Sequence, residues 1–170
     1  SRLAVIEPAV GVEELRLTAP GMPELRVPIE SAGPRLEVAI WNDRCFAFDA
    51  GAPASEWFSS FLGKTVRLVR FDPANQRLSS RDWTGAIEAK NQFSDGYPIL
   101  VASQSSLDDL NSRLPAPLPM NRFRPNIVLT GLQPYDEDRN HELSDGRIRL
   151  RLVKPCTRCK TTTTDQLTGE

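Results

Sequence analysis

Two cysteines near the end of the sequence, Cys156 and Cys159, lie three positions apart and precede four consecutive threonines. A cysteine pair at this spacing can form half of a zinc site, a redox-active dithiol, or a place where one thiolate acts as a metal ligand or nucleophile. Arg158, inside the stretch "PCTRCKTTTT", favours the third interpretation, because a fixed cation lowers the pKa of a nearby thiol. The threonine hydroxyls can donate hydrogen bonds to a bound group, and their β-branching favours an extended chain after Cys159.

The other interpretations of the cysteine pair find little support elsewhere in the sequence. A structural zinc ion needs four ligands, and the remaining candidates, Cys45 and His141, are distant and belong to no second paired motif. A thioredoxin-like dithiol needs its first cysteine at the start of a helix, whereas here a predicted strand ends at Pro155. Burial of both thiols as small apolar side chains stays open as the structural alternative. With only one histidine in the sequence, a Ser/His/Asp triad has little support.

A second candidate site lies in "NRFRPNIVLTG", where Arg122 and Arg124 flank a phenylalanine. Pro125 restricts the residue before it, so Arg124 is expected to be extended, a conformation that throws successive side chains to opposite sides. A guanidinium binds phosphate or carboxylate through paired donors, and Asn126 adds a donor or an acceptor for the edge of a heterocycle. Alternatively, these arginines pair with the acidic residues 136–138, and the sequence alone does not separate the two interpretations.

A third candidate is the loop "SDGYP", in which Asp95, Gly96 and Tyr97 precede a predicted strand. Its composition is typical of a turn, and Gly96 would allow backbone amides to approach a bound anion closely. A plain connecting loop would have the same composition, so both interpretations stay open.

Composition narrows the classes of function. The chain has 170 residues with 21 basic and 22 acidic side chains, and no run approaches the roughly 18 to 20 apolar residues that span a bilayer. We therefore expect no nucleic-acid partner and no membrane, and any anion site must be local. Three cysteines do not make the even framework of a small secreted protein, so the reducing cytoplasm is the predicted setting.

Alternating apolar residues and frequent prolines predict a mainly β first half. A helix is predicted over residues 54–62, where Trp57 and Phe61 fall at helical spacing. Ser55 is expected to cap the start of this helix, and Gly63 is expected to end it. Strands are predicted over residues 3–10, 14–20, 25–29, 35–41 and 65–71.

The second half begins after a stretch without periodicity. Residues 72–95 are interpreted as a connection between two lobes. A strand over residues 97–103 should lead into a helix over residues 105–114, with Ser105 as its cap. Two further strands are predicted, over residues 126–131 and 147–153. The expected fold is mainly β with a few short helices, of the α+β class.

Taken together, "NRFRPNIVLTG", "YDED" and "CTRCKTTTTDQLTGE" resemble the MOSC domain, the C-terminal domain of molybdenum cofactor sulfurases. The similarity is to the branch that includes the mitochondrial amidoxime reducing component and its bacterial relatives. It implies β-barrel-like lobes: residues 1–71 as the later part of a MOSC N-terminal β-barrel domain, residues 72–95 as a connection, and residues 96–170 as the first part of the MOSC domain. It also implies a segment cut at both ends, with part of the cofactor cradle expected outside these residues.

The resemblance implies a set of site residues. Cys159, the second cysteine of the pair, would ligate a pterin-bound molybdenum, and Cys156 would lie beside it without binding the metal. A soft thiolate suits high-valent molybdenum, and an arginine neutralises a phosphate. The residues expected to contact the phosphate and pterin of the molybdenum cofactor (molybdopterin) are Arg124, Asn126, Thr157, Arg158, Asp95, Gly96 and Tyr97. Pyridoxal phosphate binding is implied only as a family-level association.

The same resemblance implies an activity for the intact protein. It would be an oxidoreductase that reduces N-hydroxylated or other N-oxygenated compounds, with the chemistry carried by the cofactor. Its expected partners are a small N-oxygenated substrate and an electron donor with an iron–sulfur or flavin centre, on a separate chain or a fused C-terminal domain. Two other classes stay open: a module that carries sulfur or the molybdenum cofactor without turnover, and a structural β-rich interaction domain. A bacterial-like, cytoplasmic protein is expected.

Overall fold

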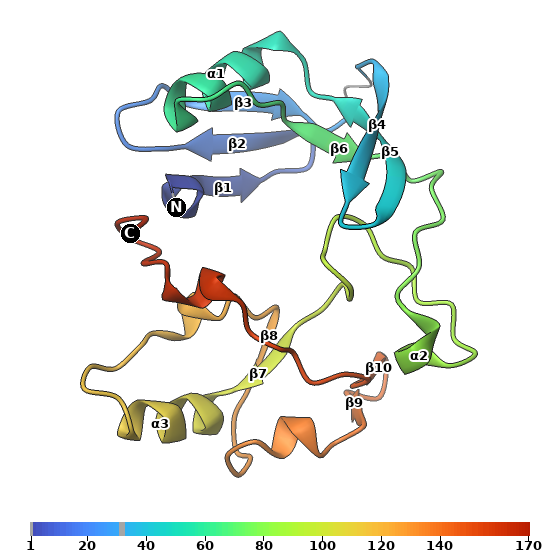
Figure 1. Ribbon diagram of the computed structural model, residues 1–170, viewed down its shortest axis with the longest axis vertical. Helices are drawn as coiled ribbons and strands as arrows, with labels where there is room; N and C mark the ends of the chain where they lie inside the picture. The colour runs from blue at the N-terminus through green and yellow to red at the C-terminus, as the bar shows by residue number, and fades with distance from the viewer. Residues whose placement is uncertain (1, 31–32) are drawn as a thin grey trace. The chain divides into compact units, whose positions relative to one another are not determined.

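The computed structural model describes residues 2–30 and 33–170 and divides the chain into two compact units. The first unit comprises Ser1–Arg77 together with Thr164–Glu170, and the second comprises Leu78–Thr163. Short strands dominate the elements of the described residues, with few and short helices among them (Figure 1). This confirms the predicted fold class.

Two antiparallel sheets form most of the first unit. The first sheet joins β1 (Glu7–Val10), β2 (Glu14–Thr18) and β3 (Leu25–Pro28). The second sheet joins β4 (Arg35–Ile40), β5 (Asp43–Asp49) and β6 (Val69–Phe71). Alternate residues of β5 are buried, as a strand with one face toward a core requires.

Helix α1 (Ala52–Leu62) packs on the first sheet and closes the core of the first unit (Figure 1). Trp57 and Phe61 are buried from the helix, and Leu17 and Val27 are buried from the strands. The indole Nε1 of Trp57 also donates to the backbone carbonyl of Pro23 at 2.7 Å, so this large side chain is buried with its polar atom satisfied. Burying each of these side chains contributes about 1.5–3 kcal/mol to stability.

The ends of α1 are set by local chemistry. The helix begins at Ala52, because Pro53 fits the first turn, where its missing N–H has no partner to lose. The predicted cap at Ser55 is therefore wrong: Gly51 precedes the helix, and the Ser55 hydroxyl donates to the Gly51 carbonyl at 3.1 Å inside the first turn. The predicted end at Gly63 is confirmed, since this residue adopts the left-handed conformation with φ 67°.

Three predictions for the first unit need correction. The strand over residues 3–10 is shorter, because residues Arg2–Val5 form the 3-10 helix η1, which packs Val5 against the core. The strand over residues 65–71 pairs only at Val69–Phe71, since its partner β5 ends at Asp49, which is opposite Val69. Strand β5 itself was not predicted, although residues 45–48 form an uninterrupted apolar run within it.

The second unit consists of short elements joined by long loops. Strand β7 (Val101–Ser103) pairs in parallel with β8 (Ile127–Leu129), and β9 (Glu142–Ser144) pairs antiparallel with β10 (Arg149–Arg151). In chain order the elements are α2 (Arg81–Thr84), β7 (Val101–Ser103), α3 (Gln104–Ser112), η2 (Met120–Arg122), β8 (Ile127–Leu129), η3 (Asp136–Asp138), β9 (Glu142–Ser144), β10 (Arg149–Arg151) and η4 (Lys160–Thr163).

Several predicted bounds in the second unit are also wrong. The strand over residues 97–103 begins only at Val101, where β8 first offers a partner. Helix α3 is capped by Ser103, whose hydroxyl accepts from the Ser106 N–H at 3.1 Å, and not by Ser105, and it ends before residue 114. Serine hydroxyls at 103, 105 and 106 could each have served as the cap, so the sequence did not distinguish them.

Two local hydrogen-bond patterns explain further differences. The strand predicted over residues 147–153 is confined to β10, because the side chain of Asp145 accepts from the backbone N–H groups of Arg147 and Ile148 at 2.9 and 2.7 Å and makes a turn there. Within the predicted connection, Ser80 caps the one-turn helix α2 by accepting from the Asp82 N–H at 3.3 Å.

No helix in the described part of the chain combines the length and apolar character needed to cross a bilayer.

Candidate functional site

Both cysteines of the pair are free and exposed in the second unit, on the segment that follows β10. This exposure excludes the alternative in which both thiols pack as small apolar side chains in a core. Cys45 does pack in that way: it is buried in β5, and burial raises the pKa of its thiol. Across the described residues, no group of three or more His, Cys, Asp or Glu side chains is placed to hold a metal ion, so a protein-only zinc site has no ligand set there.

Arg158 contacts Cys156 and not Cys159. Its Nη1 donates to the Cys156 Sγ at 3.2 Å, and its Nη2 donates to the backbone carbonyl of Phe123 at 2.6 Å. The guanidinium carbon lies 5.8 Å from the centre of the Phe123 ring. Arg158 therefore links the cysteine segment to the residues just after η2.

Thr161 is the main influence on the thiol of Cys159. The Cys159 Sγ lies 3.1 Å from the Thr161 hydroxyl. Thr161, through its hydroxyl and its backbone N–H, holds the pKa of Cys159 below its usual range, and the charge of Arg158 adds a smaller effect in the same direction. The sequence predicted the direction of this shift but attributed it to the arginine.

The threonines after Cys159 do not continue as an extended chain, which corrects the prediction from their β-branching. Residues Lys160–Thr163 form the 3-10 helix η4. The Thr162 hydroxyl donates to the Cys159 carbonyl at 3.1 Å, and the Thr163 hydroxyl donates to the Lys160 carbonyl at 2.7 Å. Threonine hydroxyls can bond backbone carbonyls three residues earlier, and here this local bonding prevails over the strand preference.

Arg124 has a backbone conformation that the sequence did not predict. Its φ is 52°, in the left-handed region, although the following proline was expected to make it extended. Such a conformation is uncommon for a residue other than glycine, and Trp41 and Tyr135 also adopt it. The side chain is exposed and makes no hydrogen bond or ion pair within the described residues, so the predicted alternative of pairing with Asp136 or Asp138 is not observed.

Asn126 joins the two strands of the parallel pair at their amino-terminal ends. Its Oδ1 accepts from the Leu100 N–H at 2.8 Å, and its own N–H donates to the Leu100 carbonyl at 2.8 Å. One end of the amide is therefore occupied inside the protein, and only the Nδ2 donors are left to meet a ligand.

The loop of the third candidate site lies just before β7. Asp95 is exposed, and a Cβ added at Gly96 would meet no atom within 4 Å, so the backbone is open on that side. The Tyr97 hydroxyl is buried without a hydrogen-bond partner, and burial, with a smaller effect from the charge of Asp82, raises the pKa of Tyr97. A buried hydroxyl without a partner is unfavourable and marks a place where a bound polar group would be accepted.

Lys154 connects this loop to the cysteine segment. Its Nζ lies 5.1 Å from the centre of the Trp83 ring and 6.0 Å from the centre of the Tyr97 ring. Together with the bonds of Arg158 and Asn126, this contact links the stretches that carry three predicted site residues, Tyr97, Arg124 and Arg158. Thr157 is exposed between the two cysteines, with its carbonyl 3.9 Å from the Cys156 Sγ.

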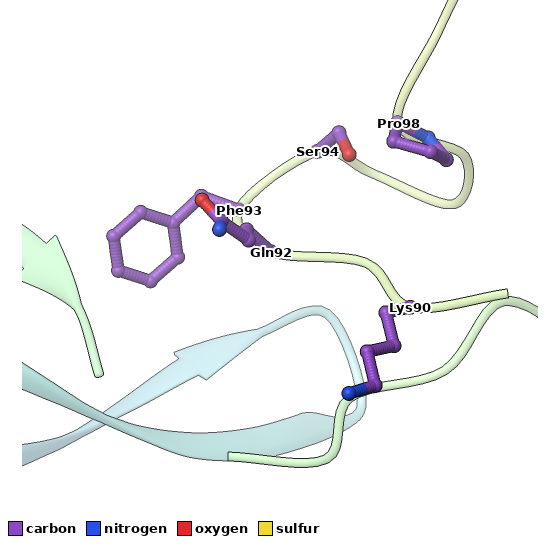
Figure 2. A pocket seen from close by; sticks show the side chains of 5 residues that line it. All are labelled: Lys90, Gln92, Phe93, Ser94 and Pro98. Atoms are coloured by element: carbon purple, nitrogen blue, oxygen red, sulfur yellow. The ribbon is translucent and has the colours of Figure 1, made fainter. Parts of the chain in front are cut away.

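A hollow of about 390 Å³ adjoins the same loop (Figure 2). It is lined by Lys90, Gln92, Phe93, Ser94 and Pro98. Ser94 and Pro98 directly flank residues 95–97 in the sequence, but none of the lining residues was predicted to form the site. Lys90 brings an ammonium group to its edge.

The sequence reasoning missed contacts between residues that lie far apart along the chain. The Arg122 Nη1 donates to the Thr163 carbonyl at 2.7 Å, across 41 positions of the chain. Glu137 accepts from the hydroxyls of Ser103 and Ser106 at 2.9 and 2.6 Å, which holds the start of α3. No local pattern indicates contacts between residues so far apart in the sequence, and the acidic run that contains Glu137 was considered only as a partner for arginines.

Two known protein families match parts of the chain. Residues 88–170 match the MOSC domain, and residues 1–65 match the MOSC N-terminal beta barrel domain. The chain belongs to the MOSC family. The matched regions lie on either side of residues 66–87, and the two units of this MOSC chain divide after Arg77. The finer boundaries predicted from the sequence, 1–71, 72–95 and 96–170, stay predictions.

Similar curated proteins include amidoxime-reducing components and a molybdenum cofactor sulfurase. The chain is 38% identical to mitochondrial amidoxime-reducing component 1 of Mus musculus, over 99% of this chain and 51% of that protein. It is 40% identical to mitochondrial amidoxime-reducing component 1 of Homo sapiens, over 71% of this chain and 37% of that protein. It is also 26% identical to molybdenum cofactor sulfurase of Bos taurus, over 99% of this chain and 22% of that protein. The MOSC chain spans about half the length of the amidoxime-reducing components that it matches.

Proposed function

We propose that this MOSC chain binds the molybdenum cofactor with Cys159 as the protein ligand of the metal. The observation that carries the proposal is the thiol of Cys159: it is exposed, it is not in a disulfide, and its pKa is lowered by Thr161. A lowered pKa makes the thiolate, which is the form that binds metals, easier to reach. The same position is the one that the family resemblance assigns to the ligand.

The residues nearby fit the cofactor. A thiolate is a soft ligand suited to molybdenum, and Arg124 offers an exposed guanidinium without an internal partner for the cofactor's phosphate. The Nδ2 of Asn126 and the buried hydroxyl of Tyr97 are available for the polar edge of the pterin. Thr157 and the open backbone at Gly96 add further hydrogen-bonding groups to this set, and Asp95 adds an acceptor.

Each of these residues has a distinct role in the proposed reaction. When bound, the molybdenum cofactor supplies the redox chemistry that removes oxygen from an N-hydroxylated or other N-oxygenated compound. Cys159 anchors the metal, and Arg124 neutralises and orients the phosphate. The left-handed backbone of Arg124 fixes the direction in which its side chain leaves the chain before β8. These residues would hold and orient the cofactor.

The whole protein is proposed to be a reductase, in keeping with the names of its relatives, the amidoxime-reducing components. Removing oxygen as water consumes electrons and protons, so a donor with an iron–sulfur or flavin centre is the proposed partner. The relatives' names place them in mitochondria, and a cytoplasmic location for this protein stays a prediction. Pyridoxal phosphate binding also stays a prediction, since no feature of the described residues bears on it.

The test compares Cys159→Ser with its matched control, Cys156→Ser, in full-length protein loaded with cofactor. Cys159→Ser should lower both the amount of bound molybdenum and the rate at which a simple aromatic amidoxime is reduced. Losing an outer hydrogen-bond partner at a metal site costs about 10- to 100-fold, and losing the ligand itself should cost more. Cys156→Ser should keep most of both. Equal losses in both variants would contradict the assignment of Cys159.

The same experiment separates the other classes of function. Molybdenum bound through Cys159 without any amidoxime reduction, given a competent electron donor, would indicate a carrier module, for which the similarity to molybdenum cofactor sulfurase is the supporting observation. Full-length protein that binds no molybdenum under these conditions would indicate an interaction domain.

A further inference from the structure

Two arginine side chains hold the segment of residues 156–163 against the turn that contains η2. From η2, the Nη1 of Arg122 donates to the backbone carbonyl of Thr163 at 2.7 Å. From the cysteine segment, the Nη2 of Arg158 donates to the backbone carbonyl of Phe123 at 2.6 Å. The bonds run in opposite directions, and along the sequence they enclose Cys159, which follows Arg158 directly.

Little else fixes the position of this segment. Of residues 155–163, all except Thr162 are exposed, so burial of apolar surface contributes little there. The turn on the other side is more constrained, because its own backbone is closed by bonds from Arg122 N–H to the Pro119 carbonyl at 3.1 Å and from Phe123 N–H to the Met120 carbonyl at 3.0 Å. The two guanidiniums therefore tie an exposed segment to a turn with a defined backbone.

Guanidinium chemistry suits this task better than an ammonium group. Arg158 uses one nitrogen for the Phe123 carbonyl and the other for the Cys156 Sγ at 3.2 Å, with its plane close to the Phe123 ring. A planar fork can hold two acceptors at fixed directions, whereas a lysine ammonium is a single flexible point charge. Two nitrogens of Arg158, a residue that the family resemblance assigned to the cofactor, are thus already engaged inside the chain.

We propose that Arg122 and Arg158 are positioning residues, which set the place of the Cys159 thiol by clamping residues 156–163 to the η2 turn. Neither guanidinium needs to touch the cofactor for this role. The consequence for cofactor binding rests on the proposed function, whereas the clamp itself does not. Arg124, two positions from Arg122, remains the arginine that faces a ligand.

The experiment measures amide hydrogen exchange in full-length protein purified without cofactor. The reporting group is the N–H of Thr162, which bonds the Cys159 carbonyl at 3.3 Å inside the clamped segment. Arg122→Gln and Arg158→Gln should speed its exchange by about three- to tenfold, because each removes a charge-assisted hydrogen bond that holds the segment. Arg122→Lys should restore part of the protection, since lysine keeps one donor. Arg151→Gln, which removes an exposed charge from β10, is the matched control and should leave the exchange unchanged.

A second measurement connects the clamp to its role. The same variants are loaded with molybdenum cofactor, and the retained molybdenum per protein is measured together with far-UV circular dichroism to verify folding. Arg122→Gln should retain about threefold to tenfold less molybdenum than wild type, with Arg122→Lys in between and Arg151→Gln at the wild-type level.

The outcomes distinguish the two proposals. Unchanged exchange at Thr162 in both glutamine variants would overturn the clamp. Faster exchange with unchanged molybdenum retention would overturn the positioning role and leave the proposed function intact. Wild-type protein that binds no molybdenum would overturn the proposed function, and the exchange rates would still decide whether the clamp exists.

Discussion

The first unit of the chain gathers Trp57, Phe61 and Val27 in one apolar cluster, whereas in the described part of the second unit Leu107 is the only apolar side chain that is fully buried. The buried side chains of the second unit are otherwise polar, with Ser103 the most completely covered. Apolar burial is non-directional and tolerates small shifts, but a buried hydroxyl needs a partner at a defined distance and angle.

This difference explains where the candidate site lies. All eight predicted site residues are in the second unit, on loops held by individual hydrogen bonds and side-chain contacts. Loops of this kind open at a lower free-energy cost than core elements, and binding sites are drawn from such regions. The first unit offers a rigid β structure, and the second offers exposed polar groups that can meet a ligand.

The largest expected effect is the loss of stability when a side chain is removed from the apolar cluster of the first unit. Trp57→Ala should lower the free energy of unfolding by about 3–5 kcal/mol, because it removes the largest side chain of the cluster and its bond to Pro23. Urea unfolding followed by far-UV circular dichroism measures this change. The control is Trp41→Ala, at a side chain that is 79% exposed, which should change stability by less than about 0.5 kcal/mol. Similar losses in both variants would show that the cluster does not dominate the stability of the first unit.

Cys45 in the first unit and Cys159 in the second unit are expected to differ in chemical reactivity. At pH 7, iodoacetamide should modify Cys159 about 100-fold faster than Cys45, because the Cys159 thiol is exposed with a lowered pKa and the Cys45 thiol is buried with a raised one. Mass spectrometry of the modified peptides gives both rates. The rate at Cys159 should reach half of its maximum below the pH of about 8.5 at which a free cysteine is half ionised.

Thr161→Val sharpens this result, since Thr161 is the main cause of the lowered pKa. Modification of Cys159 should then be slower at pH 7 and reach its plateau at higher pH. Thr157→Val, on the other side of Cys159, is the control and should not shift the profile. A shift of equal size in the control would contradict the role assigned to Thr161.

An intermediate loss of stability is expected when the buried polar interactions of the second unit are weakened. Glu137→Gln should cost about 1–2 kcal/mol of stability, because an amide offers one acceptor where the carboxylate accepts from the Ser103 and Ser106 hydroxyls. Burial of Glu137 opposes its charged form, but these hydrogen bonds outweigh burial and hold its pKa below the usual value.

The sign of the pH dependence follows from that direction. Since the pKa of Glu137 is lowered on folding, its contribution is present above about pH 4.3, the ordinary value, and is lost as the pH falls through the folded value. Urea unfolding between pH 3 and 7 should therefore show the difference between wild type and Glu137→Gln shrinking at low pH. Glu88→Gln, at an exposed carboxylate, is the control and should differ little from wild type across that range. A constant difference at all pH values would refute the carboxylate's role.

The smallest effect is expected at the surface of the second unit. Arg149 and Glu142 pair across β9 and β10 at 3.3 Å with both side chains largely exposed. A double-mutant cycle with Arg149→Gln and Glu142→Gln should give a coupling of about 0.2–1 kcal/mol, decreasing in 1 M salt. A coupling as large as that of Glu137 would remove the distinction between buried and exposed polar interactions in this unit.

The fold was predicted best where hydrophobic periodicity is strong. The helix with Trp57 and Phe61 was found in nearly the right place, and its end at Gly63 is correct, because helical spacing and left-handed glycine are local signals. The second unit was predicted less well, because its short strands depend on partners: β7 begins where β8 can pair with it, and β10 is limited by the turn at Asp145.

The sequence by itself determined which side chains are the candidates for the chemistry. A cysteine pair before four threonines and an arginine before a proline are visible in the order of residues, and both belong to the motifs that resemble the family. Only the tertiary structure decided how these groups are used. It places Arg158 on the carbonyl of Phe123, 35 positions away, and it makes Thr161 the residue that tunes Cys159. Periodicity and turn chemistry act over a few residues, whereas contacts between distant residues depend on the path of the whole chain, which no local pattern specifies.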